Sequence, residues 1–150
     1  MRTTTVLILL AVLLALPATA SALSKPRWKS SRITYVDKTK SSLDRQAVKT
    51  AVKWWNDAPG PVKLVKASSS RNANISFNSV DTPGVDYDGI ARYALDRTGT
   101  YVVFARLDLN DYYLEREDPE YVAEVTAHEL GHALGLPHLN DRCSLMYPSG

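Results

Sequence analysis

Three histidines near the C-terminus have the types and the spacing of a metal site with its own base. They lie in His-Glu-Leu-Gly-His-Ala-Leu-Gly-Leu-Pro-His, which runs from residue 128 to residue 138. His128 and His132 are four residues apart, so on a helix both imidazoles lie on one face and can hold one zinc ion at about 2.0–2.1 Å each. Glu129 is the next residue on that helix, from which its carboxylate can reach a zinc-bound water without being a ligand.

The residues that follow favour a third ligand. Gly135 provides the left-handed turn that ends a helix, and the chain then returns so that His138 can complete the site. All three histidines of the chain lie in this segment, which disfavours incidental histidines on a solvated helix. Asp141 is a competing ligand, but a loop position explains it better. No glutamate follows Glu129, which excludes the zinc peptidases that take a glutamate from a later helix.

Residues 127–148 resemble the matrixin branch of the metzincin zinc peptidases. The shared features are the Ala-His-Glu-Leu-Gly-His-Ala-Leu-Gly-Leu core, a step of eight residues from the third histidine to Met146, and Leu-Met-Tyr-Pro around that methionine. The short secreted layout is also similar to snapalysin, a small bacterial metzincin whose third ligand is usually aspartate. Because His138 occupies that position, the matrixin resemblance is closer at the metal.

The resemblance implies a secreted zinc-dependent endopeptidase. A zinc-activated water would attack the peptide carbonyl while Glu129 takes its proton as general base. Met146 would pack beneath the zinc in a Met-turn, and Tyr147 would be structural. The alternative function is a secreted, non-catalytic zinc-binding or interaction protein on the same scaffold; retention of Glu129 argues against it, because a structural zinc needs no base.

The rest of the chain predicts an α/β fold that positions this site: a twisted, mixed sheet of about five strands with two long helices, the zinc site on the second helix, and a short C-terminal Met-turn segment. Alternating, β-branched residues predict strands over 32–36, 62–65, 73–77, 88–94 and 100–109. Residues 24–31 receive no assignment.

Two helices are predicted from apolar spacing and capping residues. Ser42 and Asp44 can cap the first, which stops at residues 57–60, and Asp118 caps the second, with proline at its first position. The pair Trp54-Trp55 is either a sugar-stacking platform or, as we favour, a packing contact between helix and sheet.

Residues 1–20 predict a secretory signal peptide. Arg2 is followed by an apolar run over residues 6–16 and by Ala18-Thr-Ala20, which places cleavage after residue 20 or 22. A run of eleven residues is shorter than the roughly 20 that span a bilayer. We therefore expect an extracellular protein, with a single metzincin-like catalytic domain over residues 32–150.

Charge and cysteine content narrow the partners. The chain has 18 basic and 16 acidic residues, and without Arg2 the basic count is 17. This near balance gives no reason to invoke nucleic acid or, after signal removal, a membrane, and we expect a monomer that acts on a protein or peptide. One cysteine cannot form an internal disulfide, so zinc and packing must hold the fold.

Several departures from the family carry their own expectations. The family's structural zinc uses histidines in the sheet, whereas this chain has Arg92 and no histidine before His128, so we predict one zinc ion. The short stretch between the signal and the first strand predicts neither a pro-segment nor a cysteine switch. The chain ends two residues after Pro148, which fits either a minimal protein or a truncated sequence.

Acidic residues suggest a second cation site. Asp81, Asp86 and Asp88 can gather calcium, whose ligands are oxygens, although a polar turn between strands uses the same residues and is the favoured interpretation. Asp108, Asn110 and Asp111 are weaker candidates.

Two features near the site carry further expectations. Cys143 has three possible roles. It is a small buried residue that packs under the Met-turn, or a disulfide partner, since snapalysin-like metzincins carry a bridge there. The role ranked lowest is a thiolate that can reach zinc. Residues 89–93 resemble the edge strand beside which metzincins bind their substrate, so we expect an extended peptide to pair there.

Overall fold

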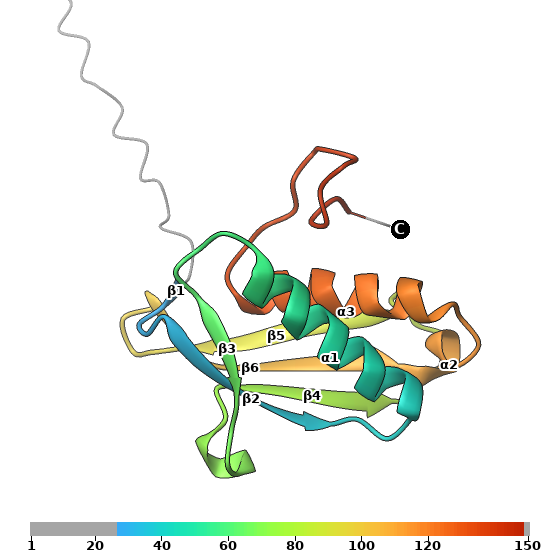
Figure 1. Ribbon diagram of the computed structural model, residues 1–150, viewed down its shortest axis with the longest axis horizontal. Helices are drawn as coiled ribbons and strands as arrows, with labels where there is room; N and C mark the ends of the chain where they lie inside the picture. The colour runs from blue at the N-terminus through green and yellow to red at the C-terminus, as the bar shows by residue number, and fades with distance from the viewer. Residues whose placement is uncertain (1–26, 149–150) are drawn as a thin grey trace, which may run out of the picture.

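Two long helices, α1 (Ser42–Asp57) and α3 (Pro119–Ala133), lie side by side across one face of a six-stranded sheet (Figure 1). The computed structural model describes residues 27–148, so the predicted signal peptide lies outside the described residues. Within them, no helix is long and apolar enough to cross a membrane. The predicted α/β architecture is confirmed.

The sheet consists of parallel strands with one antiparallel strand at an edge. Its strands follow the order β1-β6-β4-β2-β3, with each neighbouring pair parallel, while β5 pairs antiparallel with β6. In residues 27–148, β5 has β6 as its only partner, so its other edge is free. The strands are β1 (Arg27–Trp28), β2 (Arg32–Lys38), β3 (Lys63–Lys66), β4 (Ile75–Val80), β5 (Gly89–Leu95) and β6 (Tyr101–Asn110).

The sequence missed the shortest elements, and the predicted strand boundaries differ from the observed ones by one to three residues. Strand β1, helix α2 (Asp111–Leu114) and the 3-10 turn η1 (Ser70–Asn72) are too short to show a periodic pattern. Strand β4 begins two residues later than predicted. The reason lies in Asn74, whose side chain accepts hydrogen bonds from the backbone N–H of Thr34 at 2.9 Å and from its hydroxyl at 2.8 Å.

The cap of α1 is Ser41, so the prediction of Ser42 or Asp44 was wrong. Ser41 has an extended backbone, and its hydroxyl accepts a hydrogen bond from the N–H of Asp44 at 2.9 Å. A capping residue must leave the helical conformation, whereas Ser42 already belongs to the helix. The carboxylate of Asp44 is buried and accepts a hydrogen bond from Ser79 instead. The predicted end of α1 at Asp57 is confirmed.

The core between helices and sheet holds α3 in place through two tryptophans. The indole N–H of Trp55, on α1, donates to the carbonyl of Ala127 at 2.9 Å, and that of Trp28, on β1, donates to Ala133 at 2.8 Å. Each such bond stabilises the fold by about 1 kcal/mol. Trp55 thus has the predicted packing role, while Trp54 is 38% exposed. The fully buried residues of this core include Ile33, Ile75, Phe77, Leu107 and Leu130.

Candidate metal centre

Helix α3 presents His128 and His132 one turn apart and then ends abruptly. The side chain of Asp118 caps its first turn by accepting the N–H of Glu120 at 2.8 Å, as predicted. At the other end, Gly135 has φ of 93°, a left-handed conformation that glycine adopts without strain. The N–H of Leu136 reaches back to the carbonyl of Gly131 at 3.0 Å, which closes the helix and turns the chain towards His138.

The three imidazoles converge on one point. The Nε2 atom of His138 lies 3.2 Å from that of His128 and 3.0 Å from that of His132. Ligand atoms on a tetrahedral zinc at about 2.0–2.1 Å are about 3.3 Å apart, so the spacing suits one ion. In residues 27–148 these histidines form the one group of three or more ligating side chains close enough to share a metal.

Backbone carbonyls select the ring nitrogens that are free to bind. The Nδ1 atom of His128 lies 2.7 Å from the carbonyl of Leu145, and that of His132 lies 2.9 Å from the carbonyl of Leu136. A carbonyl only accepts, so each Nδ1 carries the proton and each Nε2 of a neutral ring offers its lone pair. Burial lowers the pKa of His128, which favours the neutral form; the two other histidines act in the same direction, and the bond to Leu145 opposes them.

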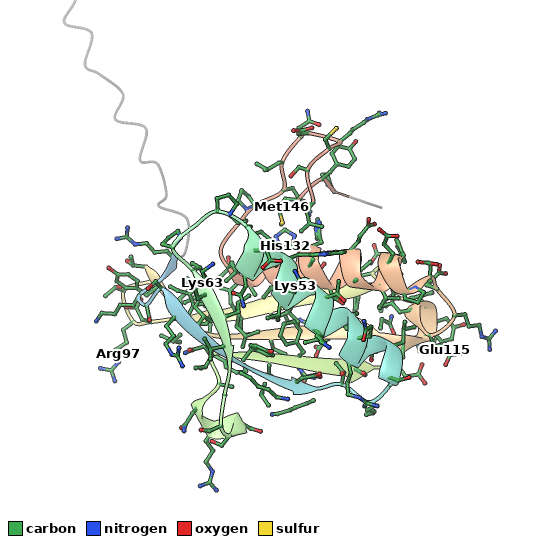
Figure 2. The ribbon with its side chains drawn as sticks, in the orientation of Figure 1. Lys53, Lys63, Arg97, Glu115, His132 and Met146 are labelled. Atoms are coloured by element: carbon green, nitrogen blue, oxygen red, sulfur yellow. The ribbon has the colours of Figure 1, made fainter. Side chains whose placement is uncertain are left out.

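Met146 forms the floor beneath this group. Its side chain is buried and lies against Gly131, where an added methyl group would meet the Met146 sulfur at 2.3 Å and the Trp55 ring at 3.0 Å. A side chain at position 131 would therefore force Met146 or Trp55 to shift. The carbonyl of Met146 also accepts the N–H of Leu139 at 2.8 Å, which ties the loop that carries His138 to the segment around Met146. Figure 2 shows His132 and Met146 at the end of α3, where this loop returns.

Glu129 lies buried between α3 and the free-edge strand. It is 9% exposed, and its Cγ atom would lie 2.9 Å from a methyl group added at Gly89, the first residue of β5. Burial raises the pKa of the Glu129 carboxyl, while the charge of His132 and a backbone hydrogen bond from Ala91 lower it. A carboxyl group that is held near the ligands and partly shielded from water has the properties of a general base.

Two cavities flank the histidines. A cavity of about 490 Å³ lies between β5 and α3 and is lined by the three histidines, by Glu129 and by residues 86–91. A second, of about 450 Å³, lies between α3 and the C-terminal loop. Tyr121, Val125 and His128 line both cavities. Because these residues follow one face of α3, they form the ridge that separates the two spaces.

The residues considered as calcium candidates do not form a ligand group in the described part of the chain. Asp81, Asp86 and Asp88 are not part of any group of three ligating side chains within the described residues. Asp88 instead accepts a hydrogen bond from the hydroxyl of Tyr121 at 2.5 Å. That bond, together with burial and the Asp88 charge, raises the pKa of Tyr121 to about 12. Asp108, one of the weaker candidates, is paired with Arg92 and Arg106.

Cys143 is exposed, so the favoured prediction of a buried packing residue was wrong. It lies in the loop after His138, where residues 138–143 are all exposed, and its backbone N–H donates to the side chain of Asp141 at 3.0 Å. Neither Cys143 nor Asp141 belongs to the group of ligating side chains in residues 27–148. The loop is held by its ends, at Leu139 and Met146, rather than by burial of its middle.

Sequence reasoning missed four contributors to the site. The carbonyls of Leu136 and Leu145 orient the imidazoles, but backbone groups have no residue-specific signal. Gly89 admits the Glu129 side chain, and Tyr121 reaches Asp88 across the cleft. Tyr121 was detectable in part, since it lies seven residues before His128 and therefore on the same helix face.

The Matrixin family model matches residues 27–149. The chain belongs to this family. Pig interstitial collagenase (Sus scrofa) is 30% identical over 149 residues, which cover 83% of this chain and 28% of the collagenase. The hatching enzyme of the sea urchin Paracentrotus lividus is 32% identical over 111 residues, covering 69% of this chain and 18% of that enzyme. This chain thus spans less than a third of these curated relatives.

Among solved structures, myroilysin aligns with a TM-score of 0.49 and 17% identity, over 75% of this chain and 46% of its own. Membership of the matrixin family agrees with the resemblance seen in the histidine motif and the Met-turn, and the members of that family are zinc metalloendopeptidases.

Proposed function

We propose that this chain is a secreted zinc-dependent endopeptidase in which His128, His132 and His138 hold the metal and Glu129 is the general base. The observation that carries the proposal is the buried Glu129 carboxylate beside three convergent Nε2 atoms, in a cavity bordered by a free strand edge. A purely structural zinc site is closed by its ligands and has no use for such a base.

The histidines fit a divalent zinc ion because their donor nitrogens are neutral and close together. A zinc ion held there would act as a Lewis acid and would lower the pKa of a bound water to about 7. The carboxylate of Glu129 then takes a proton from the attacking water and delivers it to the nitrogen of the departing amine. The carbonyls of Leu136 and Leu145 keep the imidazoles oriented throughout.

The substrate is an extended segment of a peptide or protein that adds a strand to the sheet. The outer edge of β5 is free in the described residues, and its first residues line the metal cavity. Unpaired backbone groups at such an edge bind an extended peptide through main-chain hydrogen bonds. Replacing Ile90, Ala91 or Arg92 by proline one at a time should raise KM at one or two positions while zinc stays bound. Normal cleavage or unfolding in every variant contradicts edge binding.

The decisive experiment compares Glu129→Ala with the wild type. The variant should still bind about one zinc per chain, because the three histidines remain, while hydrolysis of an unfolded protein falls by at least ~10²-fold. Glu120→Ala is the matched control, since it removes an exposed carboxylate from the same helix and should cleave normally. Turnover by the wild type in the presence of a strong chelator contradicts the zinc mechanism.

Export through residues 1–20 completes the proposal. The mature protein would then act outside the cell as a monomer with one catalytic zinc. Expression of the full chain should yield protein in the medium whose N-terminus is residue 21 or 23. Retention of the intact leader in the cell would contradict secretion without affecting the proposed chemistry.

A further inference from the structure

A hydrogen bond crosses one end of the metal cleft. Tyr121 lies in the first turn of α3, and Asp88 is the residue immediately before β5. The Tyr121 hydroxyl donates to the Asp88 carboxylate at 2.5 Å, so helix and strand are joined side chain to side chain at this point. A hydrogen bond to an ionised carboxylate is among the stronger kinds.

The backbone of the strand meets the helix next to this bond. A methyl group added at Gly89 would lie 3.0 Å from the Val125 side chain and 2.9 Å from that of Glu129. At the far end of the same strand the surface opens, because Tyr93 is 43% exposed and Leu95 is 38% exposed. Strand β5 is therefore packed against α3 at its Gly89 end and exposed at its Leu95 end.

Peptide direction relates these ends to the scissile bond. A strand added to the free edge pairs antiparallel or parallel, and antiparallel pairing is the more stable. An antiparallel peptide has its amino-terminal part beside Leu95 and its carboxyl-terminal part beside Gly89, where the Tyr121–Asp88 bond crosses. The residues that follow the scissile bond are the ones that meet the obstruction.

We propose that the Tyr121–Asp88 hydrogen bond is a crossbar that limits how many residues a substrate can place on the carboxyl side of the scissile bond. This inference rests on the proposed peptidase function and on substrate pairing with β5. Tyr121 is a specificity-determining residue in this role, because it touches both cavities beside the metal ligands and has no part in the proton transfer. The protein is accordingly selective for cleavage sites close to a carboxyl terminus or to a turn.

The chain provides a matched control in Tyr113, on α2. Its hydroxyl donates to the carbonyl of Val85 at 2.7 Å and accepts the N–H of Gly84 at 3.2 Å. Tyr113 thus tethers the loop that carries Asp88, but it lines neither cavity beside the histidines. Tyr113→Phe weakens the loop without opening the cleft, whereas Tyr121→Phe removes the crossbar and Tyr121→Ala also removes the ring.

The test measures kcat/KM for two sets of peptides with one common cleavage site. One set is lengthened by one to four residues on the carboxyl side, and the other by the same number on the amino side. Binding of both sets to zinc-loaded Glu129→Gln, with and without each tyrosine substitution, gives the same information without turnover. Thermal unfolding of every variant separates specificity from stability.

With the crossbar in place, kcat/KM of the wild type should not rise when carboxyl-side residues are added beyond the first or second. In Tyr121→Phe and Tyr121→Ala, the longest carboxyl-side peptides should improve by about 3- to 10-fold, the worth of about one main-chain hydrogen bond. The amino-side set and Tyr113→Phe should follow the wild type.

Equal length profiles for the wild type and both Tyr121 variants overturn the crossbar while leaving the peptidase proposal intact. A change of the same size in Tyr113→Phe also overturns it, because loop rigidity would then explain the effect. If the wild type cleaves none of the peptides and zinc-loaded Glu129→Gln binds none, the proposed function and the crossbar both fail.

Discussion

The molecule has two clusters of ionisable side chains that differ in where a balancing cation comes from. One is the group of three histidines, and the other is the Asp108 centre, formed by Asp108, Arg92 and Arg106. Asp108 is 4% exposed and receives Arg92 at 2.9 Å and Arg106 at 2.6 Å. Side chains alternate along β6, so this centre lies on the sheet face away from α3, which carries His128 and His132. The negative charge of Asp108 is balanced by two arginines of the same chain. The three imidazoles instead point their lone pairs at one another, so a cation from solution is needed to bind them.

A metal site and an ion pair can thus be told apart by whether the chain itself supplies the cation. The matrixin resemblance led us to expect one zinc, because Arg92 stands where the family uses a sheet histidine. The Arg92–Asp108–Arg106 contacts give that expectation a physical basis, since a buried carboxylate already bonded to two guanidinium groups has no need of a metal.

Replacing one of the three histidines should abolish zinc binding and activity. His132→Ala leaves two ligands, and we expect loss of zinc and a fall in kcat/KM of at least ~10³-fold, since a catalytic metal contributes several kcal/mol to the transition state. Zinc per chain and peptide hydrolysis are the measurements. Full zinc content in His132→Ala contradicts its role as a ligand.

Gly131→Ala should disturb the floor of the same cluster. The added methyl group meets the buried Met146 sulfur at 2.3 Å, so we expect a loss of about 1–3 kcal/mol in the free energy of unfolding. Denaturant unfolding provides the measurement. The double variant with Met146→Ala should recover part of the loss, because the clash is removed; strictly additive losses would show that the two residues do not touch.

Asp108→Asn tests the cluster of Asp108, Arg92 and Arg106. It removes the charge but keeps one acceptor, so we expect a loss of about 1–2 kcal/mol in stability with zinc content and cleavage unchanged. Unfolding in denaturant and metal analysis on the same sample measure both. A drop in bound zinc would show that the Asp108 cluster and the histidines are coupled, which contradicts their independence.

The smallest expected effect is a pH dependence of the free energy of unfolding, which comes from Asp111. Burial raises the pKa of Asp111 to about 6, together with a hydrogen bond that the protonated Asp111 donates to the Asp44 carboxylate and the negative charge of Asp44. A carboxyl whose pKa is higher in the folded state contributes stability when protonated, so this contribution is present below pH 4 and is lost as pH rises through about 6. After allowance for solvent screening, the loss is about 1 kcal/mol.

Asp111→Asn cannot titrate and still has a donor for Asp44, so its stability should lack this fall. Unfolding free energies measured from pH 4 to pH 8 test it. A wild-type curve that rises in parallel with the variant over this interval would contradict the raised pKa.

The local parts of the fold and site were predictable because their causes are local. The spacing of His128 and His132, the glutamate between them and the glycine at the helix end follow from helix geometry and backbone conformation. The strands followed from alternation, and the Asp118 cap from its side chain. The cap of α1 was misassigned among neighbouring polar residues, which only the backbone conformation distinguishes.

Long-range packing decided the rest. Whether Cys143 is buried depends on what covers its loop, and nothing in the neighbouring residues states this. The carbonyls that orient His128 and His132 have no side-chain signature. The meeting of Gly89 with Glu129, and of Asp88 with Tyr121, joins residues 33 to 40 positions apart. The proposed ligands, the proposed base and the types of the longer elements were predictable from the sequence, because each depends on residues within a few turns. The tertiary structure alone decided how the base is buried and where the cleft closes, because those features depend on where β5 meets α3.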